Sequence, residues 1–320
     1  MAEAEVGDDV LDGDPTTRRL EDRVADLLGM DGALFFPSGT QANQSAVALV
    51  TEPGTELIVE AQAHLVHYEL GGIALISGVQ IRPVAAPDGI LTASLVKGAL
   101  RAASPHLPRI SAVAVENTHN AAGGKVLVPA VLDGVARVAG EAGLPLHVDG
   151  ARLWNAAAAL GVPPDRLTVG AASVMVSFSK GLGCPVGSCL AWRGDRRARV
   201  WEIRKRLGGG MRQSGILAAA ALWALDHTAP RLGEDHAHAR VLAERLSEGA
   251  GVRVPVPETN IVMIDLVRDG DSAHAAAARL ARRGVLVVPF GPRRLRAVTH
   301  LDVSRADVAR AAQVLAEELV

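Results

Sequence analysis

Short apolar runs alternate with amphipathic segments over the first two thirds of the chain. The apolar runs are rich in Val, Ile, Leu and Phe, which is typical of strands buried on both faces. They occupy residues 33–36, 56–60, 79–84, 110–115, 144–148 and 173–178. Helical periodicity predicts a helix at residues 18–28, capped by Thr16 and Thr17, before the first run, and helices between the runs at residues 42–50, 92–103, 129–141 and 151–160. This alternation predicts an α/β fold with a largely parallel sheet and right-handed crossovers.

The pattern changes at Pro230. An alanine-rich helix is expected before it, at residues 215–226. Beyond it, helices are expected at residues 231–247, 272–283 and 306–319, and short strands at 252–254, 261–265, 285–288 and 295–299. We therefore expect a large α/β domain over residues 1–229 and a small C-terminal α+β domain over residues 230–320.

Composition narrows the classes of function. The chain has 320 residues, 49% of them apolar and 21% charged, which is ordinary for a globular protein. Its formal charge of −2 and the lack of a basic tract argue against a nucleic-acid partner. Two cysteines, Cys184 and Cys189, are too few for a disulfide framework or a zinc site. Because no signal peptide or membrane-spanning run is recognisable, we expect a cytoplasmic protein without membrane partner or metal.

Two strand ends carry complementary charges. The run at residues 173–178 leads into a polar turn that presents Lys180, and Asp149 ends the preceding predicted strand 31 residues earlier. One βαβ unit spans this distance, so the two side chains can lie on neighbouring strands, where open α/β sheets bind ligands. Pyridoxal 5′-phosphate (PLP) needs such a pair, a lysine for the Schiff base and an aspartate that keeps the pyridine nitrogen protonated.

A second ligand-binding feature follows the first predicted strand. Ser38, Gly39 and Thr40 lead into a helix, so they offer backbone N–H groups, a hydroxyl and the helix dipole to an anion. Taken alone, this pattern is explained as well by a plain helix N-cap. Together with Lys180 and Asp149, it favours a phosphate-binding site.

Three further side chains are candidates for the site, and two of them, His64 and Arg296, have two interpretations each. His64 follows a predicted strand, so it could stack on a cofactor ring or be a hydrogen-bonded loop histidine. Arg152 lies three residues after Asp149 at a helix start, facing the same edge of the sheet. Arg296, in the small domain, could bind a substrate carboxylate or be an ordinary surface arginine.

Seven motifs, in order, resemble those of one family, the low-specificity L-threonine aldolases, which are PLP enzymes of the aspartate aminotransferase-like fold type I. The motifs are Val6-Gly7-Asp8-Asp9-Val10, Ser38-Gly39-Thr40-Gln41-Ala42-Asn43, Glu116-Asn117-Thr118-His119-Asn120, His147-Val148-Asp149-Gly150-Ala151-Arg152, Ser179-Lys180-Gly181-Leu182-Gly183-Cys184-Pro185-Val186-Gly187-Ser188, Gly208-Gly209-Gly210-Met211-Arg212-Gln213-Ser214-Gly215 and Val298-Thr299-His300-Leu301-Asp302-Val303-Ser304.

The resemblance implies roles for the cofactor-binding residues. Lys180 would hold PLP, and Asp149 would pair with its pyridine nitrogen. His64 would stack on the pyridine ring. The remaining cofactor contacts would come from Ser38, Gly39, Thr40, Arg152, Ser179 and, from a neighbouring subunit, Arg212.

It also implies the substrate-binding residues and the reaction. Arg152 and Arg296 would hold the substrate carboxylate, and His106 matches a family histidine near the substrate hydroxyl by counting back thirteen residues from His119. The reaction would be retro-aldol cleavage of L-threonine or L-allo-threonine to glycine and acetaldehyde, in glycine biosynthesis or threonine catabolism. His64, His106 or a water between them would be the base. The family also implies a homotetramer built as a dimer of dimers.

Two departures from the family keep alternatives open. Relatives begin with a further segment containing Ser-Asp-Thr, whose serine binds the substrate carboxylate, and Leu11 replaces a usual tyrosine. Without that serine, we expect substrate binding to weaken by about 1.5–3 kcal/mol, the contribution of a hydrogen bond to a charged group. The alternatives are a PLP-binding protein with impaired or no aldolase activity and another PLP lyase or racemase of the same fold.

Overall fold

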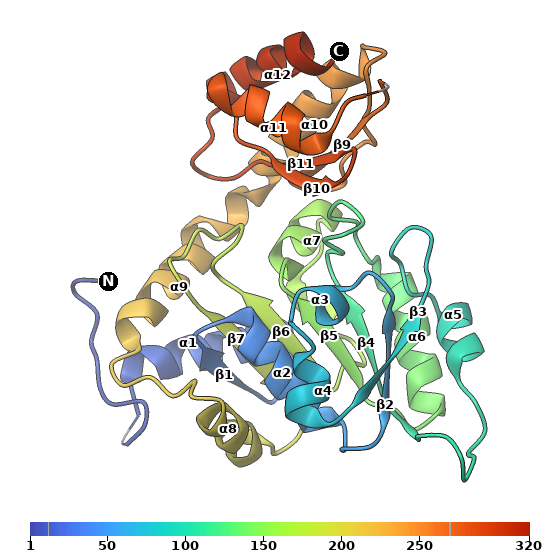
Figure 1. The fold of residues 1–320 in the computed structure, drawn as a ribbon. Helices are drawn as coiled ribbons and strands as arrows, with labels where there is room; N and C mark the ends of the chain where they lie inside the picture. The colour runs from blue at the N-terminus through green and yellow to red at the C-terminus, as the bar shows by residue number, and fades with distance from the viewer. Residues whose placement is uncertain (12, 269) are drawn as a thin grey trace. The chain divides into compact units, whose positions relative to one another are not determined.

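The computed structural model describes residues 1–11, 13–268 and 270–320, which divide into two compact units (Figure 1). The first unit contains Met1–Ala122 and Leu127–Pro230, and the second contains Gly123–Val126 and Arg231–Val320. The short segment joins the second unit through hydrogen bonds. The Thr259 hydroxyl donates to the Gly124 carbonyl at 3.0 Å, and the Val126 N–H donates to the Glu258 carboxylate at 2.7 Å.

The first unit is built on one sheet, whose strands are β1 (Gly32–Phe36), β2 (Glu56–Glu60), β3 (Gln80–Val84), β4 (Ile110–Glu116), β5 (Leu146–Gly150), β6 (Ser173–Ser177) and β7 (Ser188–Trp192). Their order is β1-β7-β6-β5-β4-β2-β3. Strands β2 to β6 are parallel. Strand β7 is antiparallel to both β6 and β1, so β1 runs in the same direction as β6.

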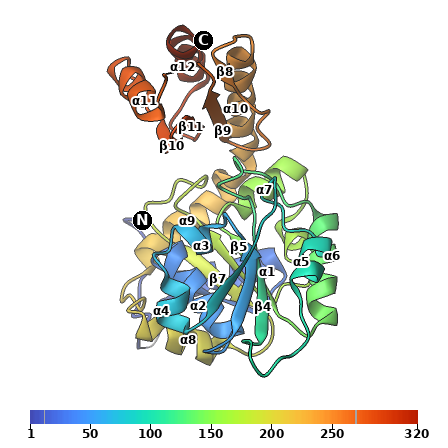
Figure 2. The same ribbon diagram turned by 45° about the vertical axis from the view of Figure 1, so that its right-hand side comes forward.

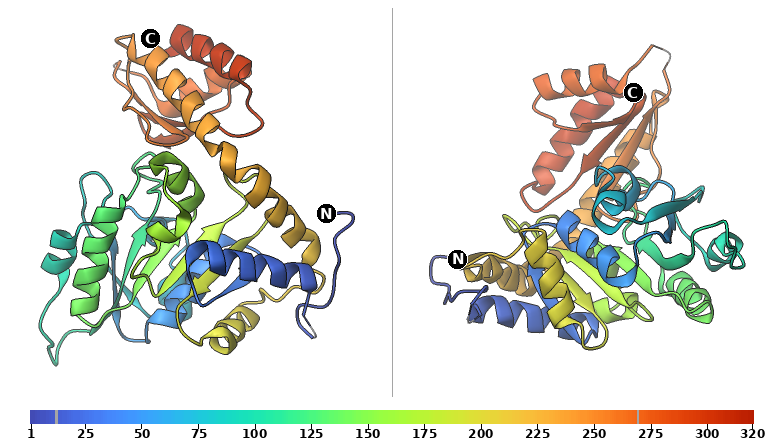
Figure 3. Two further views of the ribbon diagram at one scale, coloured as in Figure 1. Left: turned by 180° about the vertical axis from the view of Figure 1, so that it is seen from behind. Right: turned by 60° about the horizontal axis from the view of Figure 1, so that its bottom comes forward.

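Helices cover both faces of this sheet. They are α1 (Pro15–Leu28), α2 (Gly39–Val50), α3 (His64–His67), α4 (Gly72–Ser77), α5 (Ala93–Ala99), α6 (Pro129–Glu141), α7 (Leu153–Leu160), α8 (Arg197–Arg206) and α9 (Gly215–His227), with 3-10 turns at Pro164–Leu167 and Ala229–Arg231. Helices α2 and α4 lie in front of the sheet in Figure 1, and α1 and α6 lie on the other face, seen from behind in Figure 3. Because both faces are covered, every residue of β2, β4, β5 and β6 is buried.

The second unit has a sheet and core of its own (Figure 2). Its elements are α10 (Leu232–Ser247), β8 (Val252–Arg253), β9 (Ile261–Leu266), α11 (Ala273–Arg282), β10 (Val288–Gly291), β11 (Arg294–Val298) and α12 (Arg305–Leu319). The strands pair antiparallel in the order β10-β11-β9-β8. Leucine, valine and alanine side chains of α10, α11 and α12 bury the inner face of this sheet.

The sequence predicted most elements within a few residues, and two of the three differences have clear causes. The helix expected at 92–103 ends at Ala99, because Arg101 turns back to pair with Glu56 at 2.7 Å. The strand expected at 285–288 lies at 288–291, since the Val285 N–H is used to close the end of α11 on the Leu280 carbonyl. Helix α4 was not predicted. Among the described residues, no helix combines the length and apolar character needed to cross a bilayer.

Candidate active site

Most of the side chains predicted to bind or react with a ligand lie at one edge of the large sheet, where five strands have their carboxyl ends. Because β1, β2, β4, β5 and β6 share one direction, the residues that end or follow them meet there. Ser38 follows β1, His64 follows β2 and Glu116 ends β4. Asp149 is the second-last residue of β5, and Lys180 follows β6 by three residues. Neighbouring strands therefore position the aspartate and the lysine, as the sequence predicted.

Asp149 is buried and held by two donors. Asn43, on α2, donates from Nδ2 to Oδ2 of Asp149 at 2.8 Å, and the Ala151 N–H donates to Oδ1 at 3.1 Å. The Asn43 carbonyl oxygen in turn faces Nε2 of His147 at 3.2 Å. Burial lowers the pKa of His147 to about 4, so this histidine is neutral and supports the Asn43 amide as a donor. Asp149 therefore has a fixed orientation.

Glu69 is the centre of a second group of hydrogen bonds. Its buried carboxylate lies 2.9 Å from Nδ1 of His64, 2.9 Å from Nδ2 of Asn43 and 2.5 Å from Nε2 of Gln44. One face of the His64 ring stacks on Tyr68, with ring centroids 5.4 Å apart. Because Asn43 bonds both Glu69 and Asp149, a continuous chain of hydrogen bonds joins His64 to Asp149.

The environment of Lys180 favours its neutral amine. Burial lowers the pKa of Lys180 most, and the neighbouring Arg152 guanidinium lowers it further, while Asp149 and Glu116 oppose this. The lysine is nevertheless exposed to solvent. A neutral, accessible amine is the form that attacks a carbonyl carbon.

Glu116 fixes the two loops on either side of it. Its carboxylate accepts from the His64 N–H at 2.7 Å and from the Asn120 N–H at 2.9 Å. Burial and the adjacent Asp149 raise the pKa of Glu116. Asn120 also accepts from a guanidinium nitrogen of Arg152 at 3.2 Å. The loop after β4 therefore orients Arg152.

The imidazole of His119 lies in the same loop and pairs with Glu60 at the end of β2. Nε2 of His119 is 2.9 Å from the Glu60 carboxylate, and both side chains are almost fully buried. Burial alone would lower the pKa of His119, but the hydrogen bond to Glu60 and the charge of Glu116 raise it. The Glu60 carboxylate and the Ala122 N–H, which donates to Nδ1 at 3.2 Å, therefore fix the His119 ring.

The start of α2 forms a small anion-binding surface. Ser38 is its N-cap, and its hydroxyl accepts from the Gln41 N–H at 3.2 Å. A β-carbon on Gly39 would lie 3.5 Å from the Ser188 hydroxyl oxygen, which is buried and has no hydrogen-bond partner among the described residues. An unpaired hydroxyl beside free helix N–H groups fits the phosphate of PLP.

Three sequence-predicted residues lie elsewhere. His106 is exposed in the turn that precedes β4, so it lies at the opposite edge of the sheet, and its predicted place beside the substrate is not met within one chain. Arg212 pairs with Asp8 at 2.6 Å and is 60% exposed, outside this group of residues. Arg296 lies on β11 of the second unit, with its guanidinium 5.0 Å over the Phe290 ring.

Sequence reasoning missed Asn43 and Glu69 as members of the site. Asn43 is the last residue of the Ser38–Asn43 motif, whereas Glu69 lies outside all seven motifs, and no charge or glycine pattern marked either residue. His64, Glu69 and Asp149 place one ligand atom each within 4.8 Å of the others. Their oxygens and nitrogens already bond to one another or to Asn43, so this proximity is accounted for without a metal.

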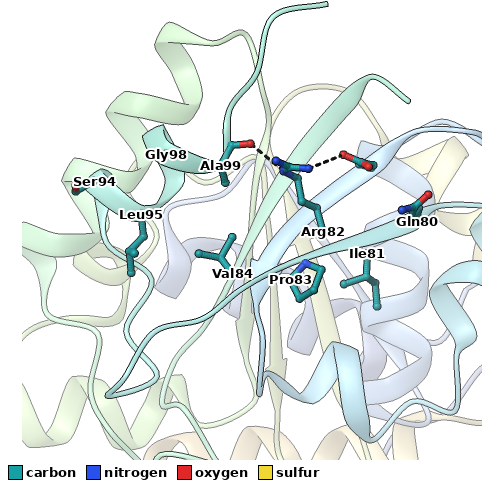
Figure 4. Close-up of a pocket in the computed structure, with 10 residues that line it drawn as sticks. Gln80, Ile81, Arg82, Pro83, Val84, Ser94, Leu95, Gly98 and Ala99 are labelled. Carbon is teal, nitrogen blue, oxygen red and sulfur yellow. Dashed lines mark hydrogen bonds and ion pairs between the residues drawn. The ribbon is translucent and has the colours of Figure 1, made fainter. Parts of the chain in front are cut away.

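A separate cavity of about 500 Å³ lies between β3 and α5 (Figure 4). Its charged lining is already paired, because Arg82 donates to the Ala99 carbonyl at 2.9 Å and contacts Glu56 at 3.7 Å. Among the described residues that line this cavity, none is placed as a nucleophile beside a general base. The residues around Asp149 and Lys180 are therefore the candidate active site.

Comparison with known proteins shows which family the chain resembles. A model of the "beta-eliminating lyase" family matches residues 1–269. The chain is 42% identical over 313 residues to a low-specificity L-threonine aldolase of Escherichia coli, covering 98% of this chain and 92% of that one. It is 41% identical over 316 residues to low-specificity L-threonine aldolase 1 of Arabidopsis thaliana, covering 96% and 88%.

A solved structure shows the same fold. The threonine aldolase of Leishmania major superposes with a TM-score of 0.81 at 22% identity, covering 95% of this chain and 89% of that one. This likeness, and the mostly parallel sheet with a second small sheet, confirm the predicted aspartate aminotransferase-like fold type I.

Proposed function

The chain belongs to the beta-eliminating lyase family, and from this premise we propose that it is a PLP-dependent aldehyde-lyase that cleaves L-threonine and related β-hydroxy-α-amino acids to glycine and an aldehyde. The observation that carries the proposal is that β5 and β6 are neighbouring parallel strands, which brings Asp149 and Lys180, three residues beyond β6, to the same edge of the sheet, where the charge of Asp149 acts on the lysine. Bound PLP supplies an electron sink for the carbon–carbon bond that breaks.

The site residues have complementary parts in binding this cofactor. Lys180 provides the neutral amine that holds it covalently, and Asp149 provides the carboxylate for the pyridinium nitrogen. The free face of His64 supports the ring, since Tyr68 covers the other face. The phosphate of PLP fits the N–H groups and hydroxyls that Ser38, Gly39 and Thr40 offer at the start of α2. Ser179, next to Lys180 in the chain, is proposed as a further cofactor contact.

Arg152 orients the substrate. The guanidinium donates to Asn120, which fixes its orientation, so its remaining N–H groups can donate to a substrate carboxylate in a fixed direction. A fixed carboxylate decides which bond of the α-carbon stands perpendicular to the cofactor ring, and so selects cleavage over racemisation. Arg296 is proposed as the second carboxylate contact, in keeping with the family motif. We propose that the two compact units are the large PLP-binding domain and the small C-terminal domain.

We further propose that the protein is a homotetramer in the cytoplasm. His106 precedes β4, at the opposite end of that strand from Glu116, so it could contribute only to the site of a second copy. For Arg212, which pairs with Asp8 in its own chain, a role across subunits is proposed from the family motif. Arg212 would reach the phosphate and His106 the substrate hydroxyl of a neighbouring site. The two cysteines, Cys184 and Cys189, are free and buried, which suits a reducing compartment.

Reconstitution with PLP tests the function. The native protein should gain visible absorbance with added PLP and should then release glycine from L-threonine and L-allo-threonine. Lys180→Ala should lose both, and Lys97→Ala, a change on α5 away from the site, should keep both. Absorbance without glycine release from either epimer would contradict the aldolase activity, and no absorbance would contradict the cofactor.

A further inference from the structure

Glu69 occupies a buried position that fixes the protons around it. It lies in the turn between α3 and α4, and its side chain has no exposed surface. Its neighbours Asn43 and Gln44 approach with amide nitrogens, which can only donate. Because all these bonds end on the carboxylate oxygens, Glu69 acts as an acceptor throughout, which is the behaviour of an ionised carboxylate.

The orientation of the Asn43 amide supports this assignment. Its Nδ2 lies between two carboxylates, 2.9 Å from Glu69 and 2.8 Å from Asp149, so its two N–H groups satisfy both. The opposite orientation would place the amide oxygen against two negative charges. With the amide fixed in this way, Oε1 of Glu69 has one remaining close neighbour, Nδ1 of His64 at 2.9 Å.

The two ring nitrogens of His64 therefore differ. Nδ1 faces a carboxylate oxygen that already accepts from the Asn43 amide, so Nδ1 is the donor and carries the proton. Nε2 has no hydrogen-bond partner among the described residues, and the side chain keeps 28% of its surface exposed. The nitrogen that is not bound to Glu69 is free to exchange its proton.

We propose that Glu69 is a positioning residue that keeps a proton on Nδ1 of His64 and leaves Nε2 as the atom that gains and loses a proton. In the neutral form, Nε2 then carries the lone pair that can accept the proton of a substrate hydroxyl. The use of this lone pair in catalysis rests on the proposed function, whereas the placement of the proton does not.

The charges around His64 also favour a proton on its ring. Glu69 lies on its own segment, Glu116 comes from β4 and Asp149 from β5, while the neutral ring of Tyr68 stacks on one face. The hydrogen bond to Glu69 raises the pKa of His64, burial opposes it, and the Asp149 and Glu116 charges add to the rise. As pH rises through this value, the proton leaves Nε2, since Nδ1 keeps its bond to Glu69.

Nitrogen NMR of ¹⁵N-histidine-labelled protein tests the placement directly, with and without PLP. His64→Asn assigns the His64 signals. The native protein should show His64 as the Nδ1–H tautomer above its midpoint. Glu69→Gln keeps an acceptor but removes the charge, so the tautomer should persist while the midpoint falls. Glu69→Leu removes both, so the tautomer preference should also be lost.

His119 is the reference within the same spectra, because its partner is Glu60 and its signals should not move when Glu69 changes. A native His64 that carries its neutral proton on Nε2 would overturn the proposal. So would a midpoint that stays in place in a Glu69→Gln protein whose His119 signals show an intact fold.

Kinetics separate the catalytic use from the proton placement. In Glu69→Gln, kcat should fall by about 10-fold to 10²-fold, within the contribution of a positioned base, and the rising limb of its pH profile should move to lower pH. Glu202→Gln, an exposed change on α8, should leave the profile unchanged. If the NMR results hold while the kcat profile stays unchanged, Glu69 still positions the proton, but the catalytic use of Nε2 is refuted.

Discussion

At Gly39, a β-carbon would lie 3.4 Å from Cε of Met175 and 3.5 Å from the Ser188 hydroxyl oxygen, which is ordinary contact. Gly39→Ala should therefore fold with a melting temperature close to the native one. The added methyl group nevertheless narrows the space at the start of α2 where the phosphate of PLP would bind. We expect the dissociation constant for PLP, measured by absorbance titration, to rise about tenfold or more, which corresponds to 1.4 kcal/mol.

Gly150 provides the contrast. A β-carbon there would lie 2.6 Å from the Met175 carbonyl oxygen, which is part of the neighbouring strand and cannot move freely. Gly150→Ala should lower the free energy of unfolding by about 1–3 kcal/mol, the usual cost of overpacking. If Gly39→Ala destabilised the protein as much as Gly150→Ala, the assignment of Gly39 to ligand binding would be wrong.

The buried His119–Glu60 pair predicts a pH-dependent contribution to stability. The folded pKa of His119 is raised above its ordinary 6.5, so the pair stabilises at lower pH and the effect is lost as pH rises through the folded value. Burial opposes, but hydrogen bonds from His119 and two backbone N–H groups lower the pKa of Glu60 below its ordinary 4.5, so its contribution is lost on acidification.

His119→Gln should therefore destabilise most between the two ordinary values, pH 4.5 and 6.5. We expect a loss of about 1.5–3 kcal/mol there, because a hydrogen bond to a charged group is removed. Urea unfolding of native and variant proteins from pH 5 to pH 9 measures the difference. A difference that grows with rising pH would contradict the raised pKa of His119.

Single residues were predictable where their chemistry is special. Lys180 and Asp149 stand out because a charged group ends a buried strand. Glu69 could not be found in this way, since its importance comes from bonds to Asn43 and His64 that only the folded chain creates. The prediction for His106 rested on counting residues, and the count does not show at which end of a strand a side chain lies.

Among the secondary-structure elements, α1 shows how a cap can serve several segments. The sequence suggested Thr16 and Thr17 as its start, but Asp14 is the N-cap. Its carboxylate accepts from the Thr17 N–H at 2.8 Å and from the Gly7 N–H at 3.0 Å, so it also fastens the N-terminal segment. Burial opposes, but these backbone bonds lower the pKa of Asp14.

Asp14→Ala should lower the free energy of unfolding by about 1–3 kcal/mol, because the cap and at least one further bond are lost. Asp14→Asn keeps an acceptor for the cap and should cost less. Urea unfolding at pH 7 gives both values. Equal stability of the Asp14→Ala and native proteins would show that the Asp14 contacts do not matter.

The order of strands and helices was predictable because the apolar pattern distinguishes buried strands from amphipathic helices. The ends of elements were less predictable. Beyond Ala99 the Arg101 side chain pairs with the distant Glu56, and the Val285 N–H is taken by the end of α11. The pairing of strands was open in the sequence, and it is this pairing that brings the ends of β2, β4 and β5 together.

At the scale of the whole molecule, shared active sites can be tested by mixing variants. Lys180→Ala lacks the cofactor amine, and Arg212→Ala would lack a contact to the phosphate of a neighbouring site. If Arg212 acts across subunits, unfolding and refolding an equal mixture should produce some sites with both residues intact. Activity per chain should exceed the average of the two variants refolded alone.

The mixed protein should also sediment as a tetramer. Activity that equals the average of the two variants would instead place Arg212 in its own chain or outside the site. Lys97→Ala mixed with native protein serves as the control, because neither chain lacks a site residue and the activity should remain that of the native protein.

The central claim is that the bond between Cα and Cβ of threonine is the one that breaks. Quantifying all products from L-threonine by the PLP-loaded protein tests it most directly. The PLP-loaded protein should produce glycine and acetaldehyde in equal amounts that match the threonine consumed, and Lys180→Ala should produce neither. Release of ammonia and 2-oxobutanoate, or of D-threonine without glycine, would contradict it.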